Sequence, residues 1–143
     1  MVTTAFWDTS ALVSLCVQQQ ASAVARQLAR KYRFVVWWST SVEMQSAFER
    51  LARTGQLSPA GYSSAARHLS RLRRGWQEVD PTPSLRFEAE SLLTRFPLKA
   101  ADALQLSAAL IRAGNFPRVR VFVASDGQLL DAARRVGFQV VAA

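Results

Sequence analysis

Four acidic residues of this chain lie inside or beside apolar stretches, where a carboxylate that is only solvated has little reason to be. They are Asp8, Glu43, Asp102 and Asp126. Buried acids almost always have a partner, and no basic residue stands next to any of the four in the sequence. A divalent cation bound by carboxylate oxygens would neutralise several of them at once, so the sequence predicts a metal site.

Two of these acids mark the point where a strand ends and a helix begins. Asp8 follows the apolar run at residues 5–7, and Asp126 follows the one at residues 121–124. A helical pattern of apolar residues comes after each of them. In an open parallel sheet, ligands bind outside the carboxyl ends of the strands, so both acids are expected at the binding crevice.

Short apolar runs alternate with helical patterns along the whole chain. Strands are expected at residues 3–7, 34–38, 119–124 and 138–141, with a short one ending at residue 79, and helices at residues 11–17, 22–32, 41–53, 58–76, 84–95, 99–113 and 128–136. Strands separated by helices imply a short parallel sheet covered on both faces, which is a three-layer α/β/α fold. The length of 143 residues suits a single domain spanning residues 1–143.

This architecture would bring the other two acids to the same place. Glu43 falls on the first turn of the helix after the second strand, and Asp102 shares a helix face with Leu106 and Ala109. Four carboxylates in one pocket raise each other's pKa unless cations are present. Their hard oxygen ligands select Mg²⁺, with Mn²⁺ as a substitute.

Each acid also has a purely structural interpretation. Asp8 and Asp126 could simply cap the helices that follow them, and Glu43 could complete a capping box at residues 40–43. Asp102 fits such a role least, although an acid near a helix start also gains from the helix dipole. Any one of the first three is more often structural than catalytic, whereas the set of four favours a functional site.

The charge of the chain is strongly positive. Lys and Arg number 18 against 10 Asp and Glu, the net charge is +8, and all but Lys31 and Lys99 of the cations are arginine. The planar guanidinium binds phosphate oxygens bidentately. The arginines cluster at residues 26–33 and 67–74, where each cluster alone is typical of a solvated helix face. The excess over the whole chain indicates a polyanion or an acidic protein partner.

Histidine, cysteine and tryptophan residues offer no second catalytic arrangement. His68 lies among arginines and is interpreted as a surface residue, and the single cysteine, Cys16, as a packed hydrophobe in a reducing compartment. The expected strands contain Trp7, Trp37 and Trp38. We therefore interpret these tryptophans as core residues and not as platforms on which nucleobases stack. No convincing pairing of a serine or cysteine nucleophile with a histidine base is evident.

The chain shows no signal for membrane insertion or secretion. No apolar run approaches the length of a membrane span, and the first residues lack a charged flank and a cleavage signal. We therefore expect a cytoplasmic protein without membrane contact.

Each of the four acids stands in a characteristic segment. The segments are Phe6-Trp7-Asp8-Thr9-Ser10-Ala11-Leu12, Ser41-Val42-Glu43-Met44-Gln45-Ser46-Ala47, Leu98-Lys99-Ala100-Ala101-Asp102-Ala103-Leu104-Gln105-Leu106 and Val123-Ala124-Ser125-Asp126. They occur in the order and spacing of PIN-domain ribonucleases, and the chain resembles most the VapC toxins of toxin/antitoxin pairs. The resemblance implies a Mg²⁺-dependent endoribonuclease whose metal is held by the four acids. It also implies an RNA substrate, a homodimer and a cognate antitoxin protein.

The resemblance further implies supporting roles for two serines. Ser10 would support the site by hydrogen bonding. This chain has Ala124 where many members of the family carry threonine two residues before the last acid. Ser125 is the candidate for supplying that hydroxyl group.

Other classes fit the residues less well. A phosphohydrolase of the haloacid dehalogenase type needs a second aspartate two residues after the first, and Ser10 stands there. A receiver domain needs an acidic pair near its first strand and a lysine after its last, and neither is present. The remaining alternative is a non-catalytic RNA- or partner-binding module that retains the fold, which would not need all four acids.

Overall fold

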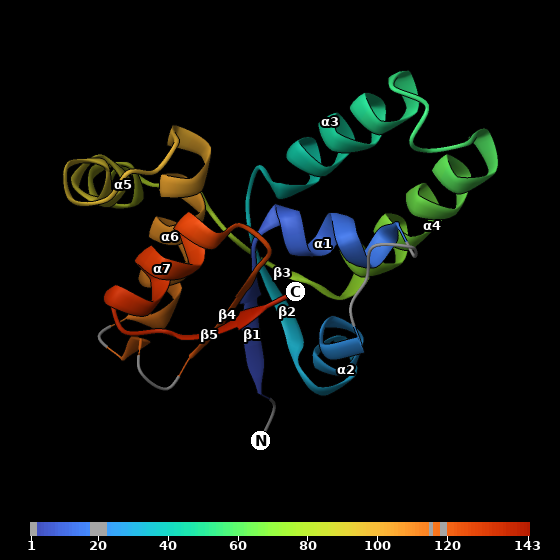
Figure 1. The fold of residues 1–143 in the computed structure, drawn as a ribbon. Coiled ribbons are helices and arrows are strands. Elements are labelled where there is room, and N and C mark those ends of the chain that lie inside the picture. The colour runs from blue at the N-terminus through green and yellow to red at the C-terminus, as the bar shows by residue number, and fades with distance from the viewer. Residues whose placement is uncertain (1–2, 18–22, 115, 118–119) are drawn as a thin grey trace.

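The computed structural model describes residues 3–17, 23–114, 116–117 and 120–143. Five parallel strands form one sheet in the order β3-β2-β1-β4-β5 (Figure 1). Their bounds are β1 Thr4–Trp7, β2 Arg33–Trp37, β3 Gln77–Val79, β4 Val121–Ala124 and β5 Gln139–Ala142. The all-parallel sheet confirms the fold expected from alternating strands and helices.

Seven helices among the described residues cover the two faces of this sheet. They are α1 Thr9–Cys16, α2 Ala23–Lys31, α3 Thr40–Arg53, α4 Pro59–Gly75, α5 Pro83–Arg95, α6 Ala100–Ala113 and α7 Gly127–Arg135. Helices α1 to α4 lie on one side of the sheet and α5 to α7 on the other, which confirms the three layers (Figure 1). None of the helices in the described part of the chain is long and apolar enough to cross a membrane.

The expected elements all form, and their ends differ from the expected ones by no more than two residues. The first residues expected for α2 and β4, Ser22 and Val119, lie outside the described part of the chain. Ser58 caps α4 as expected, accepting a hydrogen bond from the Gly61 amide at 3.0 Å. Gly137, with φ of 113°, turns the chain from α7 into β5 in a conformation that favours glycine.

Side chains of each central strand alternate between two cores. Ala5 and Trp7 of β1 pack with α1 to α4, and Phe6 packs with α5 to α7. The Phe6 ring stacks on Phe122 of β4 with centroids 5.5 Å apart, and Trp7 meets Phe34 at 4.9 Å. Burial on both faces is the reason why these strands are apolar throughout.

The expectation that all three strand tryptophans belong to the core is wrong for Trp38. Trp7 and Trp37 are 0% and 5% exposed, whereas Trp38 is 53% exposed. The strand β2 ends at Trp37, one residue earlier than expected, so Trp38 lies in the turn before α3 and no longer has to be covered. Cys16 is buried as expected, and burial raises the pKa of its thiol to about 12, which leaves it unreactive.

Candidate functional site

The four acids line one cleft of about 500 Å³ at the carboxyl edge of the sheet. They come from four separate places: the ends of β1 and β4, the first turn of α3 and the first turn of α6. The other residues that line the cleft are Thr9, Ser10, Val13, Ser14, Ala47, Arg50 and Ser125. The fold therefore brings together every acid that the sequence singled out, while their role as metal ligands stays a prediction.

Asp8 is the most enclosed of the acids, with 4% of its surface exposed. It caps α1, because its Oδ2 atom accepts hydrogen bonds from the Ser10 amide at 3.1 Å and from the Ser10 hydroxyl at 2.5 Å. Burial raises the pKa of the Asp8 carboxyl to about 6; the Ser10 hydrogen bonds oppose this rise, and the charges of Asp102 and Glu43 add to it. The neighbouring acids are thus close enough to disfavour the charged form of Asp8.

Ser10 joins two walls of the cleft. Its hydroxyl donates to Asp8, as the predicted supporting role requires, and accepts a hydrogen bond from the Ser125 amide at 3.0 Å. Ser125 thus reaches the site through its backbone N–H and is one of the residues that line the cleft. The hydroxyl role suggested for Ser125 stays a prediction.

Glu43 is held by three side chains, and the predicted capping box is wrong. Its Oε1 atom accepts hydrogen bonds from the Thr9 hydroxyl at 3.0 Å and from Gln105 Nε2 at 3.1 Å, and its Oε2 atom accepts one from the Ser39 hydroxyl at 2.5 Å. The helix α3 begins at Thr40 with Ser39 as its N-cap, and no side-chain capping bond forms there. Glu43 therefore contacts Thr9 and Gln105 with one carboxylate oxygen and the N-cap hydroxyl of its own helix with the other, and no capping box closes at residues 40–43.

Gln105 is the positioning residue that the sequence analysis missed. It is 0% exposed, and its Nε2 atom faces the Thr9 hydroxyl at 2.8 Å as well as Glu43. Its Oε1 atom is buried without a hydrogen-bond partner among the described residues. The signal in the sequence was a glutamine between Leu104 and Leu106, in an otherwise apolar helix face. Only the packed structure shows that this amide orients a carboxylate of the cleft.

Asp102 is half-buried, and its carboxylate accepts no hydrogen bond from any residue in the described part of the chain. Burial raises its pKa first, the charges of Asp126 and Glu43 raise it further, and the charge of Lys99 lowers it. Lys99 precedes Asp102 by one helical turn, so the interpretation that no basic residue accompanies the acids is wrong at this position.

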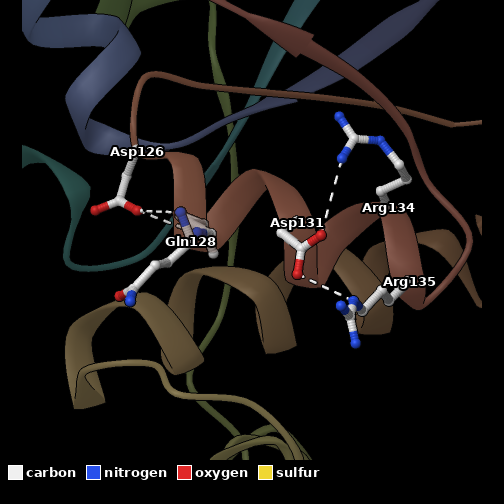
Figure 2. Close-up of polar contacts among 6 residues, drawn as sticks. Asp126, Gln128, Asp131, Arg134 and Arg135 are labelled. Atoms are coloured by element: carbon white, nitrogen blue, oxygen red, sulfur yellow. Dashed lines mark hydrogen bonds and ion pairs between the residues drawn. The ribbon is translucent and has the colours of Figure 1, made fainter.

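Asp126 combines a structural role with its place in the cleft. Its Oδ1 atom accepts hydrogen bonds from the amides of Gln128 at 2.8 Å and Leu129 at 3.1 Å, which caps α7. Figure 2 shows the other carboxylate oxygen directed away from this helix. Capping therefore occupies one oxygen and leaves the second available to a ligand, and the same holds for Asp8, whose hydrogen bonds both go to Oδ2.

The donor set fits a hard divalent cation in its chemistry, although the side chains are not arranged around one. Carboxylate oxygens are the ligands that Mg²⁺ and Mn²⁺ prefer. Among the described residues, no three acidic, histidine or cysteine side chains stand close enough together to hold an ion. Asp102 is free of hydrogen bonds to the described residues, so this side chain can turn toward the other acids without breaking a hydrogen bond to them.

Comparison with known proteins identifies the fold and no family. No family model and no curated protein matches the chain. PAE2754 from Pyrobaculum aerophilum is a solved structure with a TM-score of 0.68 and 21% sequence identity, over 99% of this chain and 91% of that one. A chain from a toxin-antitoxin complex of Klebsiella pneumoniae gives a TM-score of 0.58 at 15% identity, over 86% of this chain and 87% of that one. At such identities the likeness establishes a shared fold.

Burial of Asp8 predicts that the metal-free protein becomes less stable as pH rises. The folded state holds a proton up to a pKa of about 6, whereas the unfolded chain releases it near the ordinary value of 3.8. The free energy of unfolding of the wild type should therefore fall between these two values, by up to about 3 kcal/mol. Asp8→Asn keeps the helix cap and should lose most of this pH dependence, as measured by denaturant titrations in EDTA. A variant with the same pH profile as the wild type would show that Asp8 is not the source of the pH dependence.

The position of Gln105 predicts an unusually large effect of an isosteric change. Gln105→Glu would place a second buried carboxylate against Glu43, so unfolding free energy at pH 7 should fall by about 3 kcal/mol or more and recover partly at pH 5. Gln27→Glu, on the exposed face of α2, is the matched control and should change stability little. Equal effects of the two changes would show that Gln105 does not face Glu43.

Proposed function

We propose that this protein is a metal-dependent endoribonuclease. The observation that carries the proposal is the meeting of four carboxylates, from four distant parts of the sequence, around one cleft of a chain whose net charge is +8. Carboxylates clustered at one place repel each other, and this repulsion is costly unless a ligand relieves it. The residues proposed to hold Mg²⁺ or Mn²⁺ are Asp8, Glu43, Asp102 and Asp126.

Bound among these carboxylates, Mg²⁺ would supply the Lewis acid that activates water and stabilises charge on a phosphoryl oxygen. The contribution of the chain is to keep the carboxylates in place before substrate arrives. Ser10 holds one oxygen of Asp8, and three side chains hold Glu43. Prepositioned anionic groups reduce the reorganisation that binding and reaction require.

Arg50 is the residue proposed to hold the phosphate next to the cleaved bond. It is exposed, it lies two turns after Glu43 on α3, and among the described residues that line the cleft it carries the one positive charge. A guanidinium at the rim of an acidic cleft can pair with a phosphate that approaches the bound cation. The choice of RNA over other phosphodiesters rests on the motifs that resemble PIN-domain ribonucleases.

We further propose that the nuclease is the toxin of a VapC-like toxin/antitoxin pair, acting as a homodimer and inhibited by a cognate antitoxin. The fold shared with a chain of the Klebsiella pneumoniae toxin-antitoxin complex supports this proposal. The cleft also suits inhibition by a protein, because its acids would accept an arginine from a partner and Arg50 would pair with an acidic side chain of that partner.

The proposed activity predicts cleavage of single-stranded RNA in Mg²⁺ or Mn²⁺ and none in EDTA. Asp102→Asn should lower the cleavage rate by more than about 100-fold, because loss of a direct ligand should exceed the effect of losing an outer hydrogen bond. Asp131→Asn is the matched control on α7. Its carboxylate pairs with Arg135 at 3.0 Å and Arg134 at 4.0 Å, away from the cleft (Figure 2). The control should cleave as the wild type does.

Thermal melts of the same variants test metal binding without activity. Asp102→Asn should melt at a higher temperature than the wild type in EDTA, because one of several clustered charges is removed, and should gain less stability from Mg²⁺. Asp131→Asn should respond to Mg²⁺ as the wild type does. Undiminished cleavage in EDTA would exclude the metal mechanism, and RNA binding without any cleavage would support the non-catalytic alternative.

The proposed toxin role predicts growth arrest when the chain is expressed alone and recovery when the product of the adjacent gene is expressed with it. Asp102→Asn, produced at the same level, should be harmless because cleavage causes the arrest. A chain that cleaves RNA in vitro, but is harmless and monomeric in its native host, would leave the nuclease proposal standing and exclude the toxin proposal.

A further inference from the structure

Trp38 stands out because it is exposed and yet contacts a buried aromatic ring. More than half of its surface, 53%, is open to solvent. Its amide donates to the Val79 carbonyl at 3.1 Å, which ties its backbone to the end of β3. Its ring meets the ring of the buried Trp37 edge-on, with centroids 6.4 Å apart and planes at 64°. Trp38 therefore presents an exposed aromatic ring next to a buried one, on a backbone that is hydrogen-bonded to the end of β3.

The position of Trp38 connects it to the acidic cleft. It follows the last residue of β2, at the carboxyl edge of the sheet where the four acids meet. The next residue, Ser39, donates its hydroxyl to Glu43 Oε2 at 2.5 Å. Trp38 is thus the sequence neighbour of a residue that holds a carboxylate of the cleft, and it lies outside the residues that line the cleft itself.

A second cavity of about 210 Å³ adjoins the tryptophan that supports Trp38. Trp37 forms part of its wall, together with the segment 81–83, Leu85, Arg86 and Leu104. The proline-containing segment is stiff, and Arg86 brings a positive charge to walls that are otherwise largely apolar. Stiff apolar walls beside an arginine can accept a flat aromatic ring that is attached to a phosphate.

We propose that Trp38 stacks on a nucleobase of single-stranded RNA that lies across the acidic cleft. The inference rests on the proposed nuclease function and adds a second point of contact with the substrate. Every nucleobase has a π face, so an exposed indole binds bases with little regard to sequence. The excess of 18 basic over 10 acidic residues favours a nucleic acid over a protein as the molecule that covers this ring.

The test compares the affinity of variants for a short fluorescein-labelled oligoribonucleotide of mixed sequence, measured by anisotropy in Mg²⁺. All proteins carry Asp102→Asn, so that the oligonucleotide stays intact. Trp38→Ala should weaken binding about tenfold, and Trp38→Phe should weaken it much less because an aromatic face remains. Val42→Ala is the control, since Val42 is 68% exposed one turn further along the chain and should not contribute.

An oligomer of the same length without bases separates stacking from phosphate contacts. The protein that retains Trp38 and the Trp38→Ala variant should bind this abasic oligomer equally well. The dependence of affinity on salt should also be the same for both, because no charge is lost. Circular dichroism melts check that each variant is folded. We expect Trp38→Ala to fold, because Trp38 is largely exposed.

Equal affinities of the wild type and Trp38→Ala for the oligoribonucleotide would overturn the inference and leave the nuclease proposal intact. If Trp38→Ala binds RNA as tightly as the wild type but has a different molar mass in light scattering, Trp38 contacts another protein chain. That result would also overturn the inference. A chain that neither binds nor cleaves RNA with Trp38 and Asp102 in place would overturn the inference and the proposed function together.

Discussion

Asp8, directly after β1, is 4% exposed and close to two other acids, so its negative charge raises the free energy of the folded protein. The rest of the cleft responds to this constraint. Two hydrogen bonds from Ser10 offset part of the cost, and Lys99 offsets part of the corresponding cost at Asp102. The remaining repulsion is what a bound cation would relieve, so folding stability and ligand binding are coupled in this protein.

The walls of the cleft are joined by polar side chains that reach between elements distant in sequence. Thr9 of α1 and Gln105 of α6 meet at Glu43 of α3, and Ser10 of α1 meets the backbone before α7. These bonds lie above two apolar cores that the central strands form with opposite faces. The dense cores keep the helix starts in place, and the polar links then determine the orientation of the carboxylates.

The amino-acid sequence by itself determined the order and nature of the strands and helices, because fully buried strands are apolar throughout and helices carry caps and periodic apolar residues. It also determined which acids would meet. Asp8 and Asp126 follow strands directly, and all parallel strands end at one edge. Each of these two acids caps a helix and also lines the cleft. The two roles are compatible because capping occupies only one carboxylate oxygen of each residue.

The tertiary structure decided what depends on contacts between distant segments. Gln105 reads as one more residue of an apolar helix until packing places it against Glu43, 62 positions away in the sequence. Whether Trp38 belongs to the core depended on where β2 ends, and its pairing with β3 settles that point. The spacing of the acids is likewise tertiary. They share a cleft, no three of them stand close enough together to hold an ion, and separate hydrogen bonds orient Asp8, Glu43 and Asp126. Side-chain orientation depends on neighbours that no local pattern encodes.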